Sequence, residues 1–426
     1  MYIDKAGRPE RKKGKVLIVA SVASMIEQFN IPNIRLLISL GYETDVACNF
    51  QKGSTCSDEK IKELLNLLEQ LQADCYQIDF ERSSFDLKAA ARAYRQLDRV
   101  LKGTARTIHG KQWHKDRKPY CFIHAHSPVG GMLGRIAAKW NHCRSIYTAH
   151  GFHFYQGAPW KNWLIYYTAE WMLSWITDIL VTINREDYIR AKKRMHAKKT
   201  MYVHGIGIDF KKFARKPGVS KEKRASLGVK NTDIMLFSVG ELIPRKNHRA
   251  VIEAVSLLHN QDIKYLIAGK GVLEQELAEQ ICLLGLEKQV FLLGYRTDIP
   301  ELYQAADLFV FPSRQEGLPA ALMEAMASRT PVICSNIRGN TDLVKNHESL
   351  FDENCPDEIA ACIRQFAEKH SNQEKSAACA AAQNYGHLKP YRLDAVMDEM
   401  KTVYKTASTG GCVKARKVKN SRKVMG

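Results

Sequence analysis

The stretch Arg314-Gln-Glu-Gly-Leu-Pro-Ala-Ala-Leu-Met-Glu324 gives the strongest indication of fold and function in this chain. It follows the apolar run 307–311, which has the composition of a buried parallel strand. It also opens a helical stretch that is expected to end near residue 328. Pro319 suits the first helical position, where its missing N–H costs nothing. A buried strand, a short loop and a helix together form the repeating unit of a parallel α/β sheet.

The start of this expected helix favours binding of a phosphate or a sugar hydroxyl. The first-turn N–H groups, from Leu318 through Leu322 around Pro319, have no helical partner and lie at the positive helix end. Glu316 lies in the loop before the helix. Glu324 lies just over one turn inside it, and its side chain leans back toward the N-terminus. The pair suits a ligand that combines hydroxyls with phosphates, although the spacing alone is equally compatible with two solvated glutamates.

Short apolar runs alternate with helical stretches along the chain. Strands are expected in the first half at 16–20, 44–48, 76–80, 122–125, 145–148, 179–183 and 201–204, and in the second at 234–239, 265–268, 290–293, 308–311 and 332–335. Helices are expected at 27–40, 58–72, 85–104, 130–140, 160–175, 247–259, 273–284, 319–328 and 356–369. This alternation predicts an α/β protein with parallel sheets covered on both faces, and each half alone would form a Rossmann-like domain.

The basic charge is unevenly distributed. Residues 1–208 contain 32 Lys and Arg against 19 Asp and Glu, which gives +13, whereas residues 209–410 are balanced. Only the first half and the basic tail are therefore expected to meet an anionic surface. Eleven cysteines without a Cys-x-x-Cys pair predict neither a disulfide framework nor a zinc site, and they indicate a reducing, cytosolic compartment. We expect neither a signal peptide nor a clean membrane span.

Two segments of the basic half are candidates for contact with a membrane surface. One is a stripe at helical spacing, Lys88, Arg92, Arg95, Arg99, Lys102 and Arg106, beside an apolar face of Leu87, Tyr94, Leu97 and Leu101. The other carries aromatic residues at three- and four-residue intervals, Trp160, Trp163, Tyr167, Trp171 and Trp175. Such faces are usually core in any single helix, but together with the +13 charge they favour anionic lipid headgroups.

Further candidate site residues follow other expected strands. Gly240 permits a tight turn, and Arg245 and Lys246 place two cations where a diphosphate could be clamped. Gly269 and Gly271 follow the next strand, although glycines are common there in any α/β protein.

Histidines end two strands of the basic half. His150 precedes a glycine, and an imidazole there could donate to a sugar hydroxyl or accept a proton, although a lone histidine is more often structural. His126 ends the preceding strand, and the loop after the first strand of the chain reaches Ser24.

Over roughly residues 15–400 the chain resembles family-4 retaining glycosyltransferases of the GT-B fold. The segment from Glu316 to Glu324 is similar to the Glu-x7-Glu motif of that family. The resemblance implies that Glu316 contacts the donor sugar, that Glu324 contacts the nucleotide ribose, and that His150 faces the donor sugar. Lys246 matches the lysine of the family, whereas Glu241 stands where an arginine is usual.

The remaining matches are partial. The glycines after the second strand of the second half match a Gly-x-Gly turn, and Arg245 could replace the missing arginine. The resemblance puts His126 and Ser24 on the acceptor side. The Ala20–Ser24 loop departs from the Gly-Gly pair of many relatives, so phosphate contact there is in doubt. The implied GT-B architecture has two Rossmann-like domains facing a cleft, over 1–208 and 209–389. A helix over 390–406 would return to the first domain, and 408–426 would be a disordered tail.

The resemblance is closest to enzymes of bacterial capsule and exopolysaccharide assembly. It implies that a hexosyl or N-acetylhexosaminyl group moves, with retention, from a nucleotide-diphosphate donor, with UDP expected, to a polyprenyl-diphosphate-linked saccharide. It further implies that the acceptor hydroxyl attacks from the leaving-group side, and we expect no metal or cofactor. An anionic membrane, not nucleic acid, is the expected partner surface, with the protein cytoplasmic and peripheral on the inner face of the plasma membrane. A sugar-nucleotide epimerase of the same architecture and a basic nucleic-acid-binding protein are the alternatives.

Overall fold

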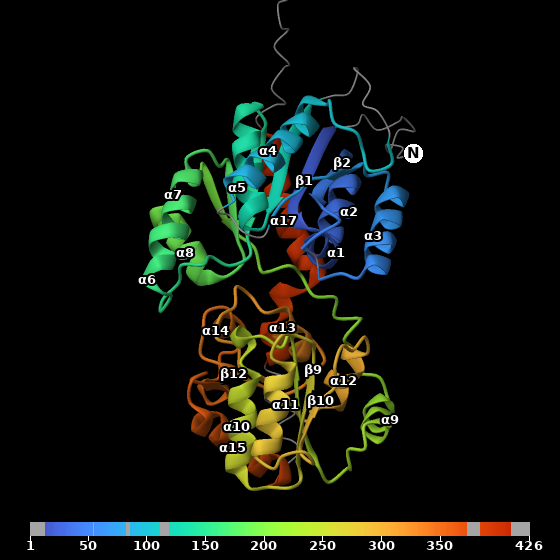
Figure 1. Ribbon diagram of the computed structural model, residues 1–426, viewed down its shortest axis with the longest axis vertical. Helices are drawn as coiled ribbons and strands as arrows, with labels where there is room; N and C mark the ends of the chain where they lie inside the picture. Colours follow the sequence, from blue (N-terminus) through green and yellow to red (C-terminus); the bar gives the residue numbers. More distant parts are fainter. Residues whose placement is uncertain (1–12, 54, 82–85, 111–118, 373–383, 410–426) are drawn as a thin grey trace, which may run out of the picture. The chain divides into compact units, whose positions relative to one another are not determined.

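The computed structural model describes residues 13–53, 55–81, 86–110, 119–372 and 384–409 (Figure 1). The chain forms two compact units, each built on one parallel sheet. Unit 1 contains the described residues up to Thr182, then Tyr188–Val203, and those from Met397 onward. Unit 2 contains Ile183–Asp187 and His204–Val396. The tail expected at 408–426 lies outside the described residues from position 410 onward.

Unit 1 contains a seven-stranded parallel sheet in the order β3-β2-β1-β4-β5-β6-β7. Its central strands are almost continuously apolar because helices cover both faces, and residues 14–21 of β1 are all buried. The strands are β1 Gly14–Val22, β2 Tyr42–Asn49, β3 Cys75–Gln77, β4 Tyr120–His126, β5 Arg144–Ala149, β6 Ile179–Thr182 and β7 Lys199–Tyr202.

The helices of this part of the chain alternate with those strands along the sequence (Figure 1). They are α1 Ala23–Phe29, α2 Ile31–Ser39, α3 Asp58–Gln70, α4 Leu87–Lys102, α5 Pro128–Trp140, α6 Trp160–Asn162, the π-helical turn η1 Trp163–Tyr167, α7 Thr168–Ser174 and α8 Arg185–Arg194. None of the helices in the described ranges is long and apolar enough to cross a membrane.

Unit 2 contains a six-stranded parallel sheet in the order β10-β9-β8-β11-β12-β13. Alternate residues of β8 enter different cores, Met235 and Phe237 on one face and Leu236 on the other, so both faces are covered. The strands are β8 Ile234–Val239, β9 Ile263–Ala268, β10 Val290–Leu292, β11 Leu308–Phe311, β12 Val332–Ser335 and β13 Leu350–Phe351.

The helices of this second part include two that follow strands at the centre of the sheet, α10 and α13. In chain order the elements are α9 Val219–Ser226, the 3-10 turn η2 Pro244–Lys246, α10 His248–Leu258, α11 Glu274–Leu283, α12 Ile299–Ala305, α13 Ala320–Ala327, α14 Asn340–Leu343, the 3-10 turn η3 His347–Ser349, α15 Pro356–Asn372, the 3-10 turn η4 Lys389–Tyr391 and α17 Leu393–Ser408.

The C-terminal helix α17 belongs to both units, because unit 2 ends at Val396 and unit 1 resumes at Met397. In unit 1 the Tyr404 hydroxyl lies 3.0 Å from Nδ1 of His124, and the Tyr404 ring stacks on Phe122. Helix α17 therefore completes the core of unit 1.

Several sequence-based bounds were wrong in detail. The helix expected at 27–40 is two helices that meet at Asn30, and the strand expected at 76–80 leaves the sheet after Gln77. The apolar face expected beside the basic stripe is also wrong in part. Leu87 is 80% exposed, and the side of α4 that packs inward carries Ala89, Ala93, Leu97 and Val100.

The strand orders give each sheet one switch point, where successive crossovers depart in opposite directions. It lies between β1 and β4 in unit 1, and between β8 and β11 in unit 2. Loops that leave the carboxyl ends of two such strands diverge and leave room for a ligand. The topology thus singles out the loops after β1 and β4 in unit 1, and those after β8 and β11 in unit 2.

Candidate active site

The loops after β8 and β11 bring two cations onto one carboxylate in unit 2. Nζ of Lys246 lies 2.7 Å from Oε1 of Glu316, and Nη1 of Arg245 lies 3.3 Å from the same oxygen. The Lys246 and Glu316 side chains are 15% and 10% exposed, so this ion pair is only partly screened by solvent. Two cations against one carboxylate leave a positive balance next to the start of α13, which suits an anionic ligand.

The backbone of the Glu316 loop is held by a buried arginine that the sequence analysis did not identify. Nε of Arg338 donates to the Glu316 carbonyl oxygen at 3.1 Å, and Nη1 lies 2.7 Å from Oδ1 of Asp187. Both side chains of this ion pair are almost fully buried. Arg338 follows β12 and precedes Gly339, and that post-strand position was the only signal in the sequence.

The glycines assigned to donor binding are explained by close packing between two loops. A Cβ on Gly269 would lie 1.8 Å from the carbonyl oxygen of Gly240, and one on Gly271 would lie 2.3 Å from that of Leu242. The Gly240 N–H donates to Ala268, and the Leu242 N–H donates to Lys270. These glycines therefore fix the shape of the loop that presents Arg245 and Lys246.

Glu324 lies inside α13, and its Oε2 accepts a hydrogen bond from the Tyr303 hydroxyl at 3.1 Å. Burial raises the pKa of Glu324 to about 7, and the Tyr303 hydrogen bond opposes this shift. Pro319 precedes the helix as its N-cap and is not its first residue. Leu322 is fully buried, and Leu318 packs against the same core, so only their backbone groups are suited to a polar ligand.

Three histidines gather at the carboxyl ends of β4 and β5 in unit 1. Nδ1 of His126 lies 3.0 Å from Nε2 of His150, and Nε2 of His124 lies 2.8 Å from the Thr148 hydroxyl. Burial lowers the pKa of His150 to about 4 and that of His124 to about 3, and it holds the pKa of His126 well below its usual range. All three rings are therefore neutral at pH 7.

The residue after His126 is in a strained backbone conformation. Ser127 has φ 64° and ψ 157°, a region that is essentially restricted to glycine. Its hydroxyl lies 2.7 Å from the Ser21 hydroxyl at the end of β1 and accepts from the Ser21 N–H at 3.0 Å. The two loops at the switch point of unit 1 are thus joined by serine hydroxyls. Ser24, which was assigned to the acceptor side, is a buried residue of α1.

The structure thus brings the assigned residues together in two groups. Arg245 and Lys246 both contact Glu316 in unit 2, and His126 contacts His150 in unit 1. Among the described residues no three His, Cys, Asp or Glu side chains converge in a way that could hold a metal ion.

Two family models match the chain. The model for a glycosyl transferase 4-like domain matches residues 34–204, and the model for glycosyl transferases group 1 matches residues 219–383. The first covers most of the chain before Val203, and the second contains Lys246 and both glutamates.

Individual relatives agree with this assignment. The chain is 35% identical to the putative glycosyltransferase EpsD of Bacillus subtilis over 347 residues, which is 79% of this chain and 82% of the relative. It is also 35% identical over 245 residues to the UDP-Gal:alpha-D-GlcNAc-diphosphoundecaprenol alpha-1,3-galactosyltransferase of Escherichia coli, which is 55% of this chain and 62% of the relative.

A solved structure shows the same fold. The crystal structure of Anabaena HepE in complex with UDP-glucose aligns with a TM-score of 0.71 at 18% identity, over 92% of this chain and 99% of that protein. The two parallel-sheet α/β units and the similarity to this structure both identify the GT-B fold. The chain belongs to the family-4 glycosyltransferases of the GT-B fold.

Proposed function

We propose that this glycosyltransferase moves a hexosyl or N-acetylhexosaminyl group from a UDP-sugar to a polyprenyl-diphosphate-linked saccharide in capsule or exopolysaccharide synthesis, with retention. The Escherichia coli relative is named for a UDP-galactose donor and a diphosphoundecaprenol-linked acceptor. Another relative, from Staphylococcus aureus, is named for capsular polysaccharide biosynthesis. These names support the choice of donor and acceptor class.

The contact of Lys246 and Arg245 with Glu316 carries the proposal. A diphosphate that enters this loop would be met by both cations, which would stabilise the charge that builds up as the sugar bond breaks. Both cations contact Oε1 of Glu316, so we assign Oε2 to the donor sugar. Glu324 would accept from the ribose hydroxyls.

In the proposed reaction the acceptor hydroxyl attacks the anomeric carbon from the side that the diphosphate leaves. The bond from the anomeric carbon to the diphosphate oxygen breaks, and that oxygen takes the proton of the attacking hydroxyl. Neutral His150 would donate to a donor-sugar hydroxyl, because a buried imidazole with a pKa of about 4 is not a cation at pH 7. No metal is required in this scheme, and activity that persists in EDTA is the expected result.

Incubation of the protein with a panel of UDP- and GDP-sugars and a short-chain polyprenyl-diphosphate saccharide tests the proposal. Mass spectrometry should find one extended product from a UDP-sugar, and proton NMR of that product should show the anomeric configuration of the donor. An inverted product, or turnover of GDP-sugars alone, would contradict it. An epimerised donor in the absence of acceptor would instead favour the epimerase alternative.

A pair of variants tests whether the product is formed at this site. Lys246→Ala should lower kcat/KM by roughly thirtyfold or more, because it removes a charge-assisted contact to the departing phosphate. Arg249→Ala is the matched control, because Arg249 lies in the next helix and pairs at the surface with Glu276. Its kcat/KM should stay within about twofold of that of the unmodified protein.

We expect the protein to bind its lipid-linked acceptor at a membrane surface. The relevant charge lies in the first half of the chain, and Lys88, Arg92 and Arg95 on α4 are exposed there, as are Arg99 and Lys102. We propose a peripheral association with the inner face of the plasma membrane. The stripe on α4 was the sequence-based candidate for this contact.

A further inference from the structure

A helical run in unit 1 presents a broad apolar surface to solvent. It consists of α6, η1 and α7, three consecutive helical segments that cover Trp160 to Ser174. Exposed large apolar side chains recur along one side of this run and just beyond its end. We call them the aromatic face: Trp160, Leu164, Ile165, Trp171, Met172 and Trp175. Soluble proteins rarely expose a contiguous patch of this kind unless it binds something.

The opposite side of the run packs into unit 1, so the orientation of the helix is fixed. Trp163, Tyr166 and Tyr167 pack against the core cluster around Phe152 and Phe154. The exposed side is therefore the side that remains after the core has been filled.

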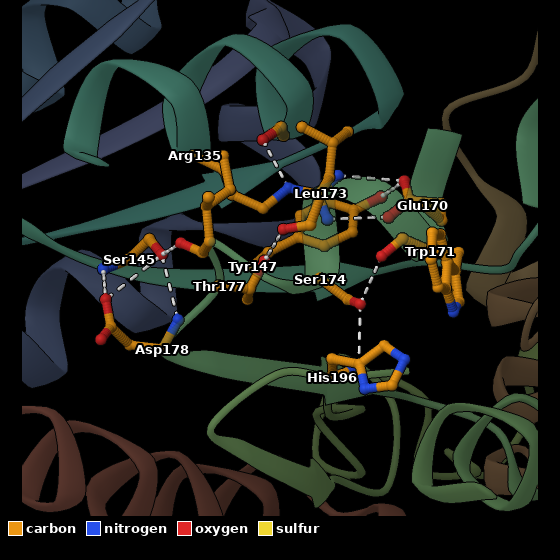
Figure 2. A network of polar contacts seen from close by, with 12 residues as sticks. Arg135, Ser145, Tyr147, Glu170, Trp171, Leu173, Ser174, Thr177, Asp178 and His196 are labelled. Carbon is orange, nitrogen blue, oxygen red and sulfur yellow. Dashed lines mark hydrogen bonds and ion pairs between the residues drawn. The ribbon is translucent and has the colours of Figure 1, made fainter. Parts of the chain in front are cut away.

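A buried polar network holds α7 in the same orientation (Figure 2). Arg135 of α5 is 1% exposed and makes a bidentate contact with Glu170, at 2.8 and 3.1 Å. The Tyr147 hydroxyl donates to the same carboxylate, and the Arg135 guanidinium lies over the Tyr147 ring at 3.9 Å. An ion pair this deeply buried would be costly to break, so Trp171, the residue after Glu170, is kept on the outside.

Basic side chains border the aromatic face. Between Tyr188 and Thr200 the chain contains six basic residues and no acidic one. The His196 ring stacks on Trp175 with ring centroids 4.0 Å apart, which places this basic segment against the aromatic face. Its exposed members are Lys192, Lys193, Arg194, Lys198 and Lys199. Asp178 at the edge is already paired with Lys198.

We propose that the aromatic face and this basic segment together form the surface with which the protein docks on an anionic lipid bilayer. Tryptophans partition into the interfacial layer, and lysines and arginines beside them meet anionic headgroups. The proposal rests on the proposed function in one respect, because a lipid-linked acceptor lies in a bilayer. The proposal assigns the main membrane contact to α6–α8 and not to α4. On α4, Leu87 is the only exposed large apolar side chain, and Lys102 is paired with Asp98.

Vesicle co-sedimentation of the full chain tests the proposal. The unmodified protein should bind vesicles that contain phosphatidylglycerol, should leave pure phosphatidylcholine vesicles largely unbound, and should be partly released by salt. Trp171→Ser with Trp175→Ser should lower the partition coefficient at least about tenfold, because two interfacial anchors are lost. Trp140→Ser is the matched control, since Trp140 is an exposed tryptophan at the end of α5 outside the aromatic face. It should change binding little.

Two sets of charge variants locate the electrostatic contribution. Replacement of Lys192, Lys193, Arg194 and Lys199 by glutamine should weaken binding and reduce its dependence on salt. Replacement of Lys88, Arg92, Arg95 and Arg99 should have a smaller effect on both. A larger effect of the α4 set would overturn the assignment of the docking surface.

Other outcomes count against the proposal. Unchanged binding by the double tryptophan variant would exclude the aromatic face. A dimer in analytical ultracentrifugation that this variant dissociates, without vesicle binding by either form, would show that the face joins two copies of the chain. UDP-sugar turnover on a soluble acceptor analogue, measured in parallel, separates this test from the proposed function, because either result can fail alone.

Discussion

At the scale of single residues, Glu316 is held at both its side chain and its backbone. Lys246 and Arg245 contact one carboxylate oxygen, and Arg338 donates to the carbonyl oxygen. A side chain fixed in this way can be aimed at a reacting atom without loss of orientation during turnover. Glu324 is held more loosely, through Tyr303.

Substitutions of Glu316 and Glu324 should change different kinetic parameters. Glu316→Gln should lower kcat about a hundredfold with KM within a few fold, because it removes charge that stabilises the developing sugar cation. Glu324→Ala should mainly raise the KM for the donor, since a ribose contact persists from ground state to transition state. Steady-state kinetics with varied UDP-sugar measures both. Equal losses of kcat at unchanged KM in the two variants would argue against these roles.

Donor affinity should depend on pH through Glu324. Its pKa is raised to about 7, so the carboxyl is largely protonated at pH 6 and ionised at pH 8. An ionised carboxylate accepts hydrogen bonds from ribose hydroxyls more strongly, so the Kd for UDP should fall between pH 6 and pH 8. Calorimetric titration measures this change, and Glu324→Gln should remove it.

The raised pKa of Glu324 also makes the free energy of unfolding depend on pH. Between its ordinary pKa of 4.5 and about 7 the folded state keeps a proton that the unfolded state releases, so the free energy of unfolding falls as pH rises through this window. The contribution is fully present below pH 4.5 and is lost above about 7. Urea unfolding of Glu324→Gln should show a weaker pH dependence in the same window. An identical profile for both proteins would mean that Glu324 titrates normally.

His126 should act by fixing the tautomer of His150. In the described structure the buried Nε2 of His126 has no hydrogen-bond partner, and an orphaned N–H costs more than an orphaned lone pair. The proton of His126 is therefore expected on Nδ1, which donates to His150 Nε2 and leaves the proton of His150 on its own Nδ1.

Variants of His126 separate this role from simple packing. His126→Asn places an amide near the position of Nδ1 and should keep most of kcat, whereas His126→Gln places it near Nε2. The Gln variant should lose about tenfold, the worth of one hydrogen bond. Nitrogen NMR of labelled histidines should show the His150 tautomer retained in the Asn variant and lost in the Gln variant. If both variants lose activity equally, packing alone explains the site.

At the scale of secondary-structure elements, Lys246, Glu316 and His126 lie where neighbouring crossovers diverge. The loops after β8 and β11 meet at Glu316, and those after β1 and β4 meet at Ser21 and Ser127. The loop after β12 reinforces the first of these through Arg338, which links the Glu316 loop to Asp187 at the start of α8. The position of the Glu316 loop thus depends on a buried ion pair between two other segments.

Removal of that link should destabilise the protein. Arg338→Leu leaves the fully buried Asp187 without its cation and should lower the free energy of unfolding by about 3 kcal/mol. Addition of Asp187→Leu should recover part of the loss, because the remaining cost is then that of an apolar pair. Urea unfolding of the two single variants and the double variant measures the coupling. A double variant no more stable than Arg338→Leu would show that the pair is not the source of the cost.

At the scale of the whole molecule, each unit has its own sheet and its own apolar clusters. The residues assigned to the donor all lie in unit 2 except His150, whereas the basic charge and the proposed docking surface lie in unit 1. In our proposal, the nucleotide and the bilayer are therefore contacted by residues of different cores.

UDP should accordingly protect unit 2 more than unit 1. At a concentration a hundred times its Kd, a ligand that binds only the folded state adds about 2.7 kcal/mol to the stability of the part that binds it. Hydrogen exchange followed by mass spectrometry should show slower exchange in peptides covering 240–247 and 312–324. Peptides of β2 and α3 serve as the internal control. Protection confined to unit 1 would place the nucleotide site elsewhere.

The sequence by itself determined the α/β class, the approximate bounds of most strands, and the loop that carries Glu316 and Glu324. These follow from local patterns, because buried parallel strands must be apolar throughout and helix starts have characteristic residues. Only the tertiary structure decided that Arg338 reaches Asp187 across 151 positions of sequence, and that His126 meets His150. It also decided that Trp171 faces outward while Glu170 faces inward. The physical reason is that the partner of a buried charge, and the face of a helix that is covered, depend on neighbours supplied by distant segments.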